Sequence, residues 1–319
     1  TIMKTITVIV PVFNEGENVD IIYSGIVEVF ERDLSQYRLE IVFSDNGSGD
    51  DTYARIMRLS EVDERVKGIR LSRNFGYQAN ILTGYLNASG DAVIQMDSDG
   101  EDPPSVIVEF VRQWEAGYNV VYGVRISRQE SAFIQWQRRL FYSMLNRITS
   151  LRLPPGAGDF RLLDREVVTI LCERFGERDP YIRGLVTFIG FRQIGVHYHR
   201  GKRMRGPSKF SYFDYVHLAW DAITSFSQVP LKLIAVVGFC LSGLSVLASL
   251  YYLGLYITGN VPVKGFTTLI LILLFVSGVQ LLCLGILGEY IARIFNEVKA
   301  RPRSIVTDSC GFSTPPRSA

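Results

Sequence analysis

The stretch "AVIQMDSDGEDPP" (92–104) decides how the first half of the chain is interpreted. An apolar run ends in two aspartates one residue apart, Asp97 and Asp99, and a double proline follows. Side chains at positions i and i+2 of a strand point the same way, so both carboxylates could face one point. Unpaired, they would repel each other, and the pKa of one of them would rise. A divalent cation would resolve this conflict, because Mg²⁺ or Mn²⁺ binds one or two carboxylates together with phosphate oxygens.

The surrounding sequence, residues 1–125, alternates between strand-like and helix-like stretches. The apolar runs that predict strands are 5–12, 39–44, 66–72, 92–96 and 120–123. Between them, apolar residues recur at helical spacing, as in Ile81, Leu82, Tyr85 and Leu86. Strands that alternate with helices favour an α/β fold with a mainly parallel sheet covered on both faces. In such sheets ligands bind beyond the carboxyl ends of the strands.

Polar loops follow four of these predicted strands, and three of the four loops carry acids. The loops read "PVFNE" (11–15), "SDNGSGDDT" (44–52), "SRNFGYQAN" (72–80) and "DSDGED" (97–102). Loops are polar in any case, but that does not explain why acids recur. A cation held by Asp97 and Asp99 suits the departure of a diphosphate, because it neutralises charge on the leaving oxygens. The sequence therefore predicts a binding site at this edge of the sheet.

Three other motifs fit these loops less well. The acidic stretch resembles the first motif of haloacid-dehalogenase-type phosphatases, in which the first aspartate is a nucleophile, but that motif normally ends the first strand and continues with threonine. An EF-hand loop needs glycine where Asp102 stands, and "GSGDDT" (47–52) lacks the third glycine of a dinucleotide loop. Asp102 itself, before Pro103-Pro104, is expected to start a helix.

Beyond residue 125 the pattern loosens. Residues 131–151 have helical spacing, and 153–166 predict a Pro/Gly turn that delivers Asp159 and leads to another helix. Five basic residues follow within 199–209. The amphipathic segment 211–229 is expected to lie as a helix in the headgroup interface, with packing against the soluble domain as the alternative.

Two long runs without any charged residue, 233–257 and 266–288, dominate the C-terminal part. At ~1.5 Å per residue, each exceeds the ~30 Å hydrocarbon core of a bilayer. A short connection joins them and carries only Lys264, whereas basic residues cluster before and after the pair. Positive charge stays on the cytoplasmic side, so the N-terminal ~230 residues and the C-terminal tail are expected there. The start of the chain does not have the pattern of a signal peptide. The two apolar runs predict a multi-pass integral protein of the cell inner membrane.

These patterns give four expected regions: a cytoplasmic domain (1–210), an interfacial helix (211–229), two transmembrane helices (230–292) and a cytoplasmic tail (293–319). The net charge of +2 with 21% charged residues excludes a general nucleic-acid binder. The four cysteines show neither metal-ligand spacing nor a disulfide framework. Small residues in both apolar runs would permit close helix packing and thus a homo-oligomer.

Taken in order, the motifs resemble the GT-A-fold, family 2 inverting glycosyltransferases. They are similar to the polyprenyl-phosphate branch, which includes dolichyl-phosphate mannose synthases and, with a hairpin like this one, bactoprenol glucosyltransferases. The motifs that carry the resemblance are "VIVPVFNE", "SDNGSGDDT", "LSRNFGYQAN", "MDSDGEDPP", "YGVR", "GAGDFRLLDR" and "RGPSKFSYF". The resemblance extends from about Ile6 to about Arg303.

For the nucleotide sugar, the resemblance implies a pocket lined by Pro11, Phe13, Asn14 and Glu15, with Glu15 facing the ribose. Asp45 would meet the base, which is expected to be uracil. Asp97 and Asp99 would hold Mg²⁺ or Mn²⁺ against the diphosphate, and Glu101 stands where the family usually has a glutamine that also reaches the metal. Two departures are Asn46, where the family often has aspartate, and Gly100, which is expected to loosen the loop.

For the acceptor, the resemblance implies that Arg125, Arg138 and Arg139 lie near its phosphate. Asp159 stands where the family has an acid beside the sugar. The element "RxxGxSK", which contacts phosphates, matches Arg203, Ser208 and Lys209. Asp159, Asp99 and Arg125 are the residues expected to carry catalysis.

The function expected from these residues is inverting transfer of a hexose from a UDP-sugar to polyprenyl (undecaprenyl) phosphate at the cytoplasmic membrane face. Glucose leads among the sugars, and mannose or an aminosugar stays open. The expected partners are the nucleotide sugar, the polyprenyl phosphate and membrane lipid, with no nucleic acid. A membrane-anchored phosphatase and a non-catalytic nucleotide-sugar-binding scaffold are the alternatives.

Overall fold

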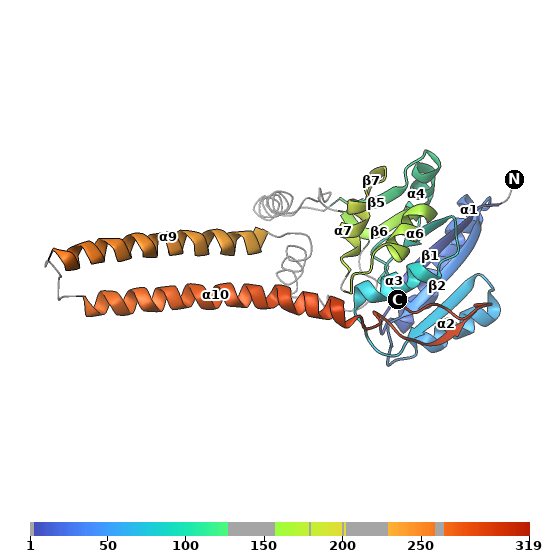
Figure 1. Ribbon diagram of the computed structural model, residues 1–319. Coiled ribbons are helices and arrows are strands. Elements are labelled where there is room, and N and C mark those ends of the chain that lie inside the picture. Colours follow the sequence, from blue (N-terminus) through green and yellow to red (C-terminus); the bar gives the residue numbers. More distant parts are fainter. Residues whose placement is uncertain (1–2, 127–156, 179, 200, 202–228, 259–264) are drawn as a thin grey trace. The chain divides into compact units, whose positions relative to one another are not determined.

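The computed structural model describes residues 3–126, 157–178, 180–199, 201, 229–258 and 265–319 (Figure 1). These residues fall into two compact units. The first unit holds the β-sheet and includes residues 301–319, and the second holds two long helices. The expected helices at 131–151 and 211–229 lie outside the described residues, apart from Val229.

Within the described residues, the first unit is built on an eight-stranded sheet whose strand order is β7-β5-β6-β4-β1-β2-β3-β8. The strands are β1 (Thr5–Val12), β2 (Arg38–Asp45), β3 (Val66–Leu71), β4 (Ala92–Gln95), β5 (Val120–Arg125), β6 (Ala157–Asp164), β7 (Gln193–Tyr198) and β8 (Val306–Cys310). The five predicted strands are confirmed as β1 to β5, each end within two residues of its expected position.

The sheet is mixed but mainly parallel, as predicted. The pairs β1–β2, β1–β4, β2–β3 and β5–β7 are parallel, whereas β4–β6, β5–β6 and β3–β8 are antiparallel. The register places Val12 opposite Asp45, so β1 and β2 end level with each other. The backbone N–H of Met96, just past β4, donates to the carbonyl of Ile9 at 3.0 Å. The loops after β1, β2 and β4 therefore leave the same edge of the sheet.

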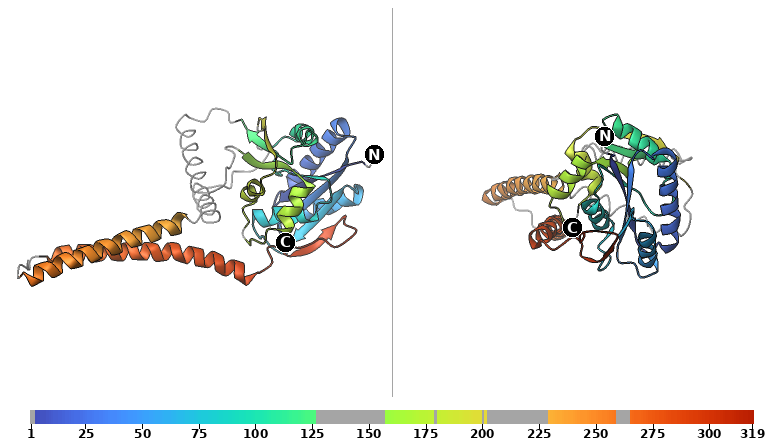
Figure 2. Two further views of the ribbon diagram at one scale, coloured as in Figure 1. Left: turned by 45° about the horizontal axis from the view of Figure 1, so that its top comes forward. Right: turned by 90° about the vertical axis from the view of Figure 1, so that its right-hand side faces the viewer.

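Helices cover both faces of the sheet, as predicted (Figure 2). On one face lie α1 (Gly16–Asp33), α2 (Thr52–Val62) and α4 (Val106–Glu115). On the other face lie α3 (Tyr77–Asn87) and α6 (Arg165–Glu173), and α7 (Ile182–Ile189) packs against α6.

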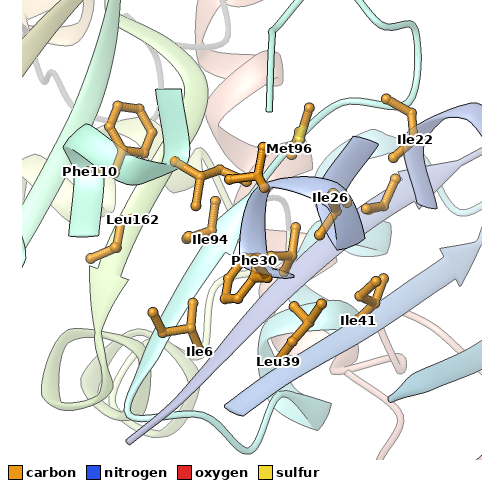
Figure 3. Packing of buried hydrophobic residues seen from close by; sticks show 14 of the residues in the cluster. Ile6, Ile22, Ile26, Phe30, Leu39, Ile41, Ile94, Met96, Phe110 and Leu162 are labelled. Carbon is orange, nitrogen blue, oxygen red and sulfur yellow. The ribbon is translucent and has the colours of Figure 1, made fainter. Parts of the chain in front are cut away.

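The core on the α1 face follows from the two periodicities of strand and helix. Ile22, Ile26 and Phe30 recur every four residues along α1 and lie over Ile6 of β1 and Ile41 of β2 (Figure 3). All five side chains are buried. Burying each such side chain stabilises the fold by ~1.5–3 kcal/mol. This packing holds α1 against β1 and β2.

Strand β6 corrects the expected turn at 153–166. Within the described part of that segment, Ala157–Asp164 form a strand between β4 and β5, and α6 starts at Arg165, which confirms the expected following helix. Phe160, Leu162 and Leu163 are fully buried. Glycine and proline favoured a turn locally, but burial of these apolar side chains on both faces of the sheet decides the conformation.

The last residues of the chain complete the first unit. Strand β8 pairs with β3 at the sheet edge, and the fully buried Ser304 shares a 2.8 Å hydrogen bond with the hydroxyl of Thr83. The expected boundary at residue 210 therefore leaves out residues 301–319, which pack with the sheet. The short polar stretch "VTDSC" (306–310) lacks the apolar alternation that predicts a strand.

The second unit consists of α9 (Val229–Ile257) and α10 (Phe266–Lys299), which lie side by side (Figure 1). They contain the two expected apolar spans. Segments Val229–Leu247 and Phe275–Lys299 are long and apolar enough to cross a membrane, and among their described residues the most apolar stretch of each holds no buried residue. Helices of 29 and 34 residues with exposed leucines and phenylalanines fit membrane association.

Candidate active site

The loops after β1 and β2 are tied together through Asn14. Its backbone N–H donates to the Ser48 hydroxyl at 2.9 Å, and its side-chain Oδ1 accepts from the Gly49 N–H at 2.9 Å. Asn14 adopts a left-handed backbone with φ of 53°, which asparagine tolerates better than most residues. Pro11 is buried in β1 and Phe13 is half-buried just beyond it. Asn14, one of the predicted nucleotide residues, therefore lies against the loop that follows β2.

Glu15 stands at the start of helix α1. Its carboxylate accepts a hydrogen bond from the Asn18 amide, and its backbone N–H donates to the Thr52 hydroxyl at 3.0 Å. Both contacts fix the half-buried side chain at a helix N-terminus, where the backbone N–H groups favour negatively charged ligands.

Asp45 is the last residue of β2 and its side chain has no exposed surface. Oδ1 accepts hydrogen bonds from the Ser48 N–H at 3.1 Å and from the Ser48 hydroxyl. Oδ2 has no hydrogen-bond partner among the described residues, and the Arg70 guanidinium lies 3.7 Å away. Burial raises the pKa of Asp45, although the Ser48 bonds and the charge of Arg70 oppose the shift. Asp45 is thus a buried acceptor at the strand end, and its contact with a base stays a prediction.

Asn46 joins this loop to the one after β3. Its amide donates to Asn74 Oδ1 at 3.0 Å, and its own Oδ1 accepts from the Phe75 N–H at 2.9 Å. An aspartate here could accept but could not donate, so the departure from the family pattern has a structural use. The next residue, Gly47, has φ of 72°, and an added Cβ would lie 2.8 Å from the Arg73 carbonyl carbon.

Asp97 lies just beyond β4 and meets Tyr77, from the first turn of α3. The Tyr77 hydroxyl donates to Asp97 Oδ1 at 2.6 Å and accepts from the Gln95 amide at 3.3 Å. Withdrawal from solvent, and then the charges of Asp159, Asp102 and Asp99, raise the pKa of Asp97 to about 7, while the Tyr77 bond opposes the rise.

Asp99 and Glu101 share a tight loop. The Glu101 backbone N–H donates to Asp99 Oδ1 at 3.0 Å, and Gly100 between them has φ of 71°. This left-handed conformation needs glycine, so Gly100 shapes a defined turn and does not simply loosen the loop.

The acids around Asp97 fit a divalent cation. Asp97, Asp99, Asp102 and Asp159 place like charges near one another, and a cation would offset their repulsion. Among the described residues, no three His, Cys, Asp or Glu side chains form a ready metal site. Two carboxylates with phosphate oxygens from a substrate are the usual set for Mg²⁺. Glu101 as a third ligand stays a prediction.

Asp159 lies on β6 between two arginines. Arg161 Nη2 is 2.8 Å from Oδ1, and Arg183 Nη2, from α7, is 2.9 Å from Oδ2. Burial acts to raise the pKa of Asp159, but the charges of Arg183 and Arg161, together with the Arg183 hydrogen bond, lower it. Asp159 is therefore held as a carboxylate with little tendency to accept a proton.

The helix-start role expected for Asp102 is wrong. Helix α4 begins at Val106, and no side chain caps it. Asp102 instead has no exposed surface, accepts a hydrogen bond from the Tyr198 hydroxyl, and lies 3.6 Å from the Arg125 guanidinium. A buried carboxylate needs partners that satisfy its charge, and Tyr198 and Arg125 are those partners for Asp102.

Arg125 ends β5, and its guanidinium lies close enough to Asp159 and Asp97 to influence them electrostatically. The structure thus brings Arg125, Asp97 and Asp159 together from β5, β4 and β6. Five further predicted residues lie outside the described part of the chain: Arg138, Arg139, Arg203, Ser208 and Lys209.

Four residues of this site were not predicted: Tyr77, Arg161, Arg183 and Tyr198. Arg161 carried a usable signal, because it lies two positions after Asp159 and so shares its face of a strand. Tyr77 lies inside the quoted motif "LSRNFGYQAN", but its contact with Asp97 joins two elements. For Arg183 and Tyr198 we find no signal in the sequence.

The chain matches the family model of glycosyl transferase family 2 over residues 7–171, and it belongs to that family. It is accordingly a glycosyltransferase, which confirms the resemblance and the enzyme class predicted from the motifs. A second model, the GtrB C-terminal hairpin, matches residues 229–294, which cover α9 and most of α10.

Curated relatives match nearly the whole chain. The bactoprenol glucosyl transferase of Shigella phage SfII is 37% identical over 306 residues, covering 95% of this chain and 98% of the relative. The uncharacterized glycosyltransferase YkcC of Bacillus subtilis (strain 168) is 39% identical over 307 residues, covering 96% and 94%. The prophage bactoprenol glucosyl transferase homolog of Escherichia coli (strain K12) is 35% identical over 303 residues, covering 94% and 98%.

Proposed function

We propose that this enzyme transfers a hexose, glucose first among the candidates, from a UDP-sugar to polyprenyl phosphate. The observation that carries the proposal is the grouping of Asp97, Asp159 and Arg125 at the sheet edge, in a chain that also carries a matched hairpin. The relatives named bactoprenol glucosyl transferases support the lipid acceptor and the glucose donor. Mannose and aminosugars use the same chemistry and are distinguished by experiment.

The nucleotide part of the donor is assigned to the linked loops after β1 and β2. Asp45, buried at the end of β2 beside Arg70, is assigned to the uracil side of this pocket. Glu15, fixed beside Asn18 and Thr52, would bind the ribose hydroxyls. Asn14 holds the two loops together and so keeps these two acceptors at a fixed spacing.

The diphosphate of the donor is assigned to the loop after β4. Asp97 and Asp99 would hold Mg²⁺ or Mn²⁺, because their like charges favour a cation between them. When bound, the cation supplies charge neutralisation on the leaving diphosphate. Tyr77 donates to Asp97 and orients its carboxylate in advance.

The acceptor phosphate is already anionic, so it needs orientation and charge neutralisation more than a strong base. One of its oxygens forms a bond to the anomeric carbon, the bond from that carbon to the nucleoside diphosphate breaks, and configuration inverts. Arg125 offsets negative charge beside the reacting groups. Asp159, held as a carboxylate by Arg161 and Arg183, orients the sugar or acceptor and is poorly suited to act as base.

The hairpin of α9 and α10 is assigned to the membrane, with both helices spanning it. Arg203, Ser208, Lys209, Arg138 and Arg139 are proposed to meet the lipid-linked phosphate at headgroup height, on the cytoplasmic face of the inner membrane. The basic residues that flank the hairpin, against the single Lys264 between its helices, support this orientation.

Incubation of the full chain in lipid vesicles with UDP-[¹⁴C]glucose, a short polyprenyl phosphate and Mg²⁺ tests the proposal. We expect a labelled lipid, with less or none from GDP-mannose or a UDP-aminosugar. The double variant Asp97→Asn, Asp99→Asn should lose turnover, while Asp33→Asn, an acid paired with Arg32 on α1, should keep it. If no nucleotide sugar labels the lipid, the proposed function is wrong.

A further inference from the structure

A chain of polar contacts joins the loop after β4 to β7 and to the end of β5. The Tyr198 hydroxyl donates to Asp102 Oδ1 and accepts from Arg125 Nε at 3.3 Å. Arg125 Nη2 lies 3.6 Å from Asp102 Oδ2. Asp102 has no exposed surface and Tyr198 is 5% exposed, whereas 32% of the Arg125 side chain is exposed. The arginine is thus held from its buried side while part of it reaches solvent.

The backbone is shaped to keep the tyrosine ring in place. Tyr198 lies opposite Arg125 in the parallel pairing of β7 with β5. A Cβ added at Gly123 would lie 2.6 Å from Cε1 of the ring, so glycine leaves the space that the ring fills. On its other side the ring meets Phe160 edge-on, with centroids 5.8 Å apart and planes at 83°. The Tyr198 hydroxyl therefore has a fixed position.

A second glycine makes room for the arginine itself. A Cβ added at Gly158 would lie 3.3 Å from Arg125 Nε and 3.4 Å from Nη2, so the guanidinium rests on the backbone of β6. The neighbouring residue on that strand is Asp159. The charge of Arg125 is among those that keep Asp159 ionised. Tyr198, Asp102 and Gly158 together fix the guanidinium beside the acids of the site.

Burying the Asp102 carboxylate costs folding free energy, and holding Arg125 in place gives this cost a functional reason. Asp102 is a buried carboxylate whose charge acts on Asp97, and a buried charge needs partners that satisfy it. A free arginine side chain has large rotamer entropy, which is lost when it binds an anion. Holding the guanidinium in advance reduces that loss.

We propose that Tyr198 and Asp102 are positioning residues. They hold the Arg125 guanidinium in place to bind phosphate oxygens of the substrates. The inference rests on the proposed function, because it takes the reaction to involve a nucleoside diphosphate and a lipid phosphate. Either substrate could supply these oxygens, and the substrate whose KM changes identifies the source.

The test is a double-mutant cycle with Tyr198→Phe, Arg125→Ala and both changes together in the full chain. Tyr198→Phe removes one hydroxyl and leaves the ring that fills the space over Gly123. We expect the KM for one phosphate substrate to rise about ten-fold or more, with a smaller change in kcat. On the Arg125→Ala background the same change should have little further effect, because Tyr198 acts through Arg125.

Tyr23→Phe is the matched control, since the Tyr23 hydroxyl also donates to an aspartate, Asp63, at 2.7 Å, away from the site. It should leave both KM values unchanged. Equal effects of Tyr198→Phe with and without Arg125 would overturn the inference, as would an unchanged KM for both substrates.

Binding measurements separate this inference from the proposed function. Calorimetry with UDP and with a short polyprenyl phosphate on the same proteins needs no turnover. If the wild type transfers no sugar, the proposed function fails, and weaker phosphate binding by Tyr198→Phe would still support the positioning role. If the wild type is active but Tyr198→Phe binds both ligands normally, the positioning role alone fails.

Discussion

Arg183 and Asp159 form an ion pair across two elements of the candidate site, with 2.9 Å between Nη2 and Oδ2. The arginine comes from α7 and the aspartate from β6, so the pair couples the helix to the strand that runs between β4 and β5. Arg161 binds the other carboxylate oxygen. Their combined charge lowers the pKa of Asp159 against the effect of burial, and the group stays ionised at neutral pH.

Arg183→Gln should therefore change the pH dependence of activity. Removing a cation from beside Asp159 raises the pKa of that carboxyl, so the protonated form appears at a higher pH. We expect the acidic limb of kcat/KM, measured at saturating Mg²⁺, to move to higher pH than in the wild type. Arg174→Gln, beyond the end of α6, is the control and should leave the limb in place. An unmoved limb in Arg183→Gln would show that Asp159 does not need its charge for catalysis.

Asp97→Asn should stabilise the cation-free protein. The pKa of Asp97 is raised from an ordinary 3.8 to about 7, so between these values the folded state holds a proton that the unfolded state releases. The contribution of Asp97 to the free energy of unfolding therefore decreases as the pH rises from about 4 to about 7. Above pH 7 it decreases no further. Thermal unfolding in EDTA should give a higher midpoint for Asp97→Asn than for the wild type at pH 8, and a smaller difference at pH 4.

Added Mg²⁺ provides the second half of this experiment. It should raise the midpoint of the wild type at pH 8, because binding to the folded state stabilises it. The variant should respond less, since one carboxylate is missing. Asp33→Asn should behave as the wild type in both conditions. A variant that melts below the wild type at pH 8 in EDTA would contradict the like-charge account of this site.

The sequence predicted the strand ends well because the signals there are local. Apolar runs and helical spacing placed β1 to β5, and parallel pairing then brought the loops of Asn14, Asp45 and Asp97 to one edge. Direct local cues favoured the wrong conformation at two other points. Asp102 before two prolines looked like a helix start, and the glycines around Asp159 looked like a turn. In both cases burial against distant strands overrode the local preference.

The side chains that contact Asp97 and Asp159 could not be predicted, because these contacts join residues far apart in the chain. Tyr77 meets Asp97 across twenty positions, and Arg183 meets Asp159 across twenty-four. Strand β8 pairs with β3 after two long helices have intervened. A single sequence carries no pattern for such long-range pairs, so Asp97 and Asp159 were predicted without the Tyr77 and Arg183 contacts that orient them.

Gly47→Ala should weaken donor binding. Gly47 has φ of 72°, and an added methyl group would press on the Arg73 backbone at 2.8 Å. The loops after β2 and β3, which Asn46 links, would have to separate. We expect a loss of stability of ~1–3 kcal/mol and a higher KM for the UDP-sugar. Gly49→Ala, where an added Cβ meets nothing within 4 Å, should change neither quantity appreciably. Equal behaviour of the two variants would show that the loop tolerates the methyl group.

Ser304→Ala should destabilise the first unit, although Ser304 lies far in sequence from the acids of the candidate site. The Ser304 hydroxyl is buried, shares a hydrogen bond with Thr83 on α3, and accepts from the Ala319 N–H at 3.0 Å. Its removal leaves buried polar groups without that partner, at a cost of ~1–3 kcal/mol. Because Tyr77 and Thr83 share α3, the same change should also lower activity at temperatures near unfolding. Ser313→Ala, an exposed position in the same segment, is the control. If both variants unfold at the wild-type temperature, the buried hydrogen bonds of Ser304 do not contribute to the stability of the sheet.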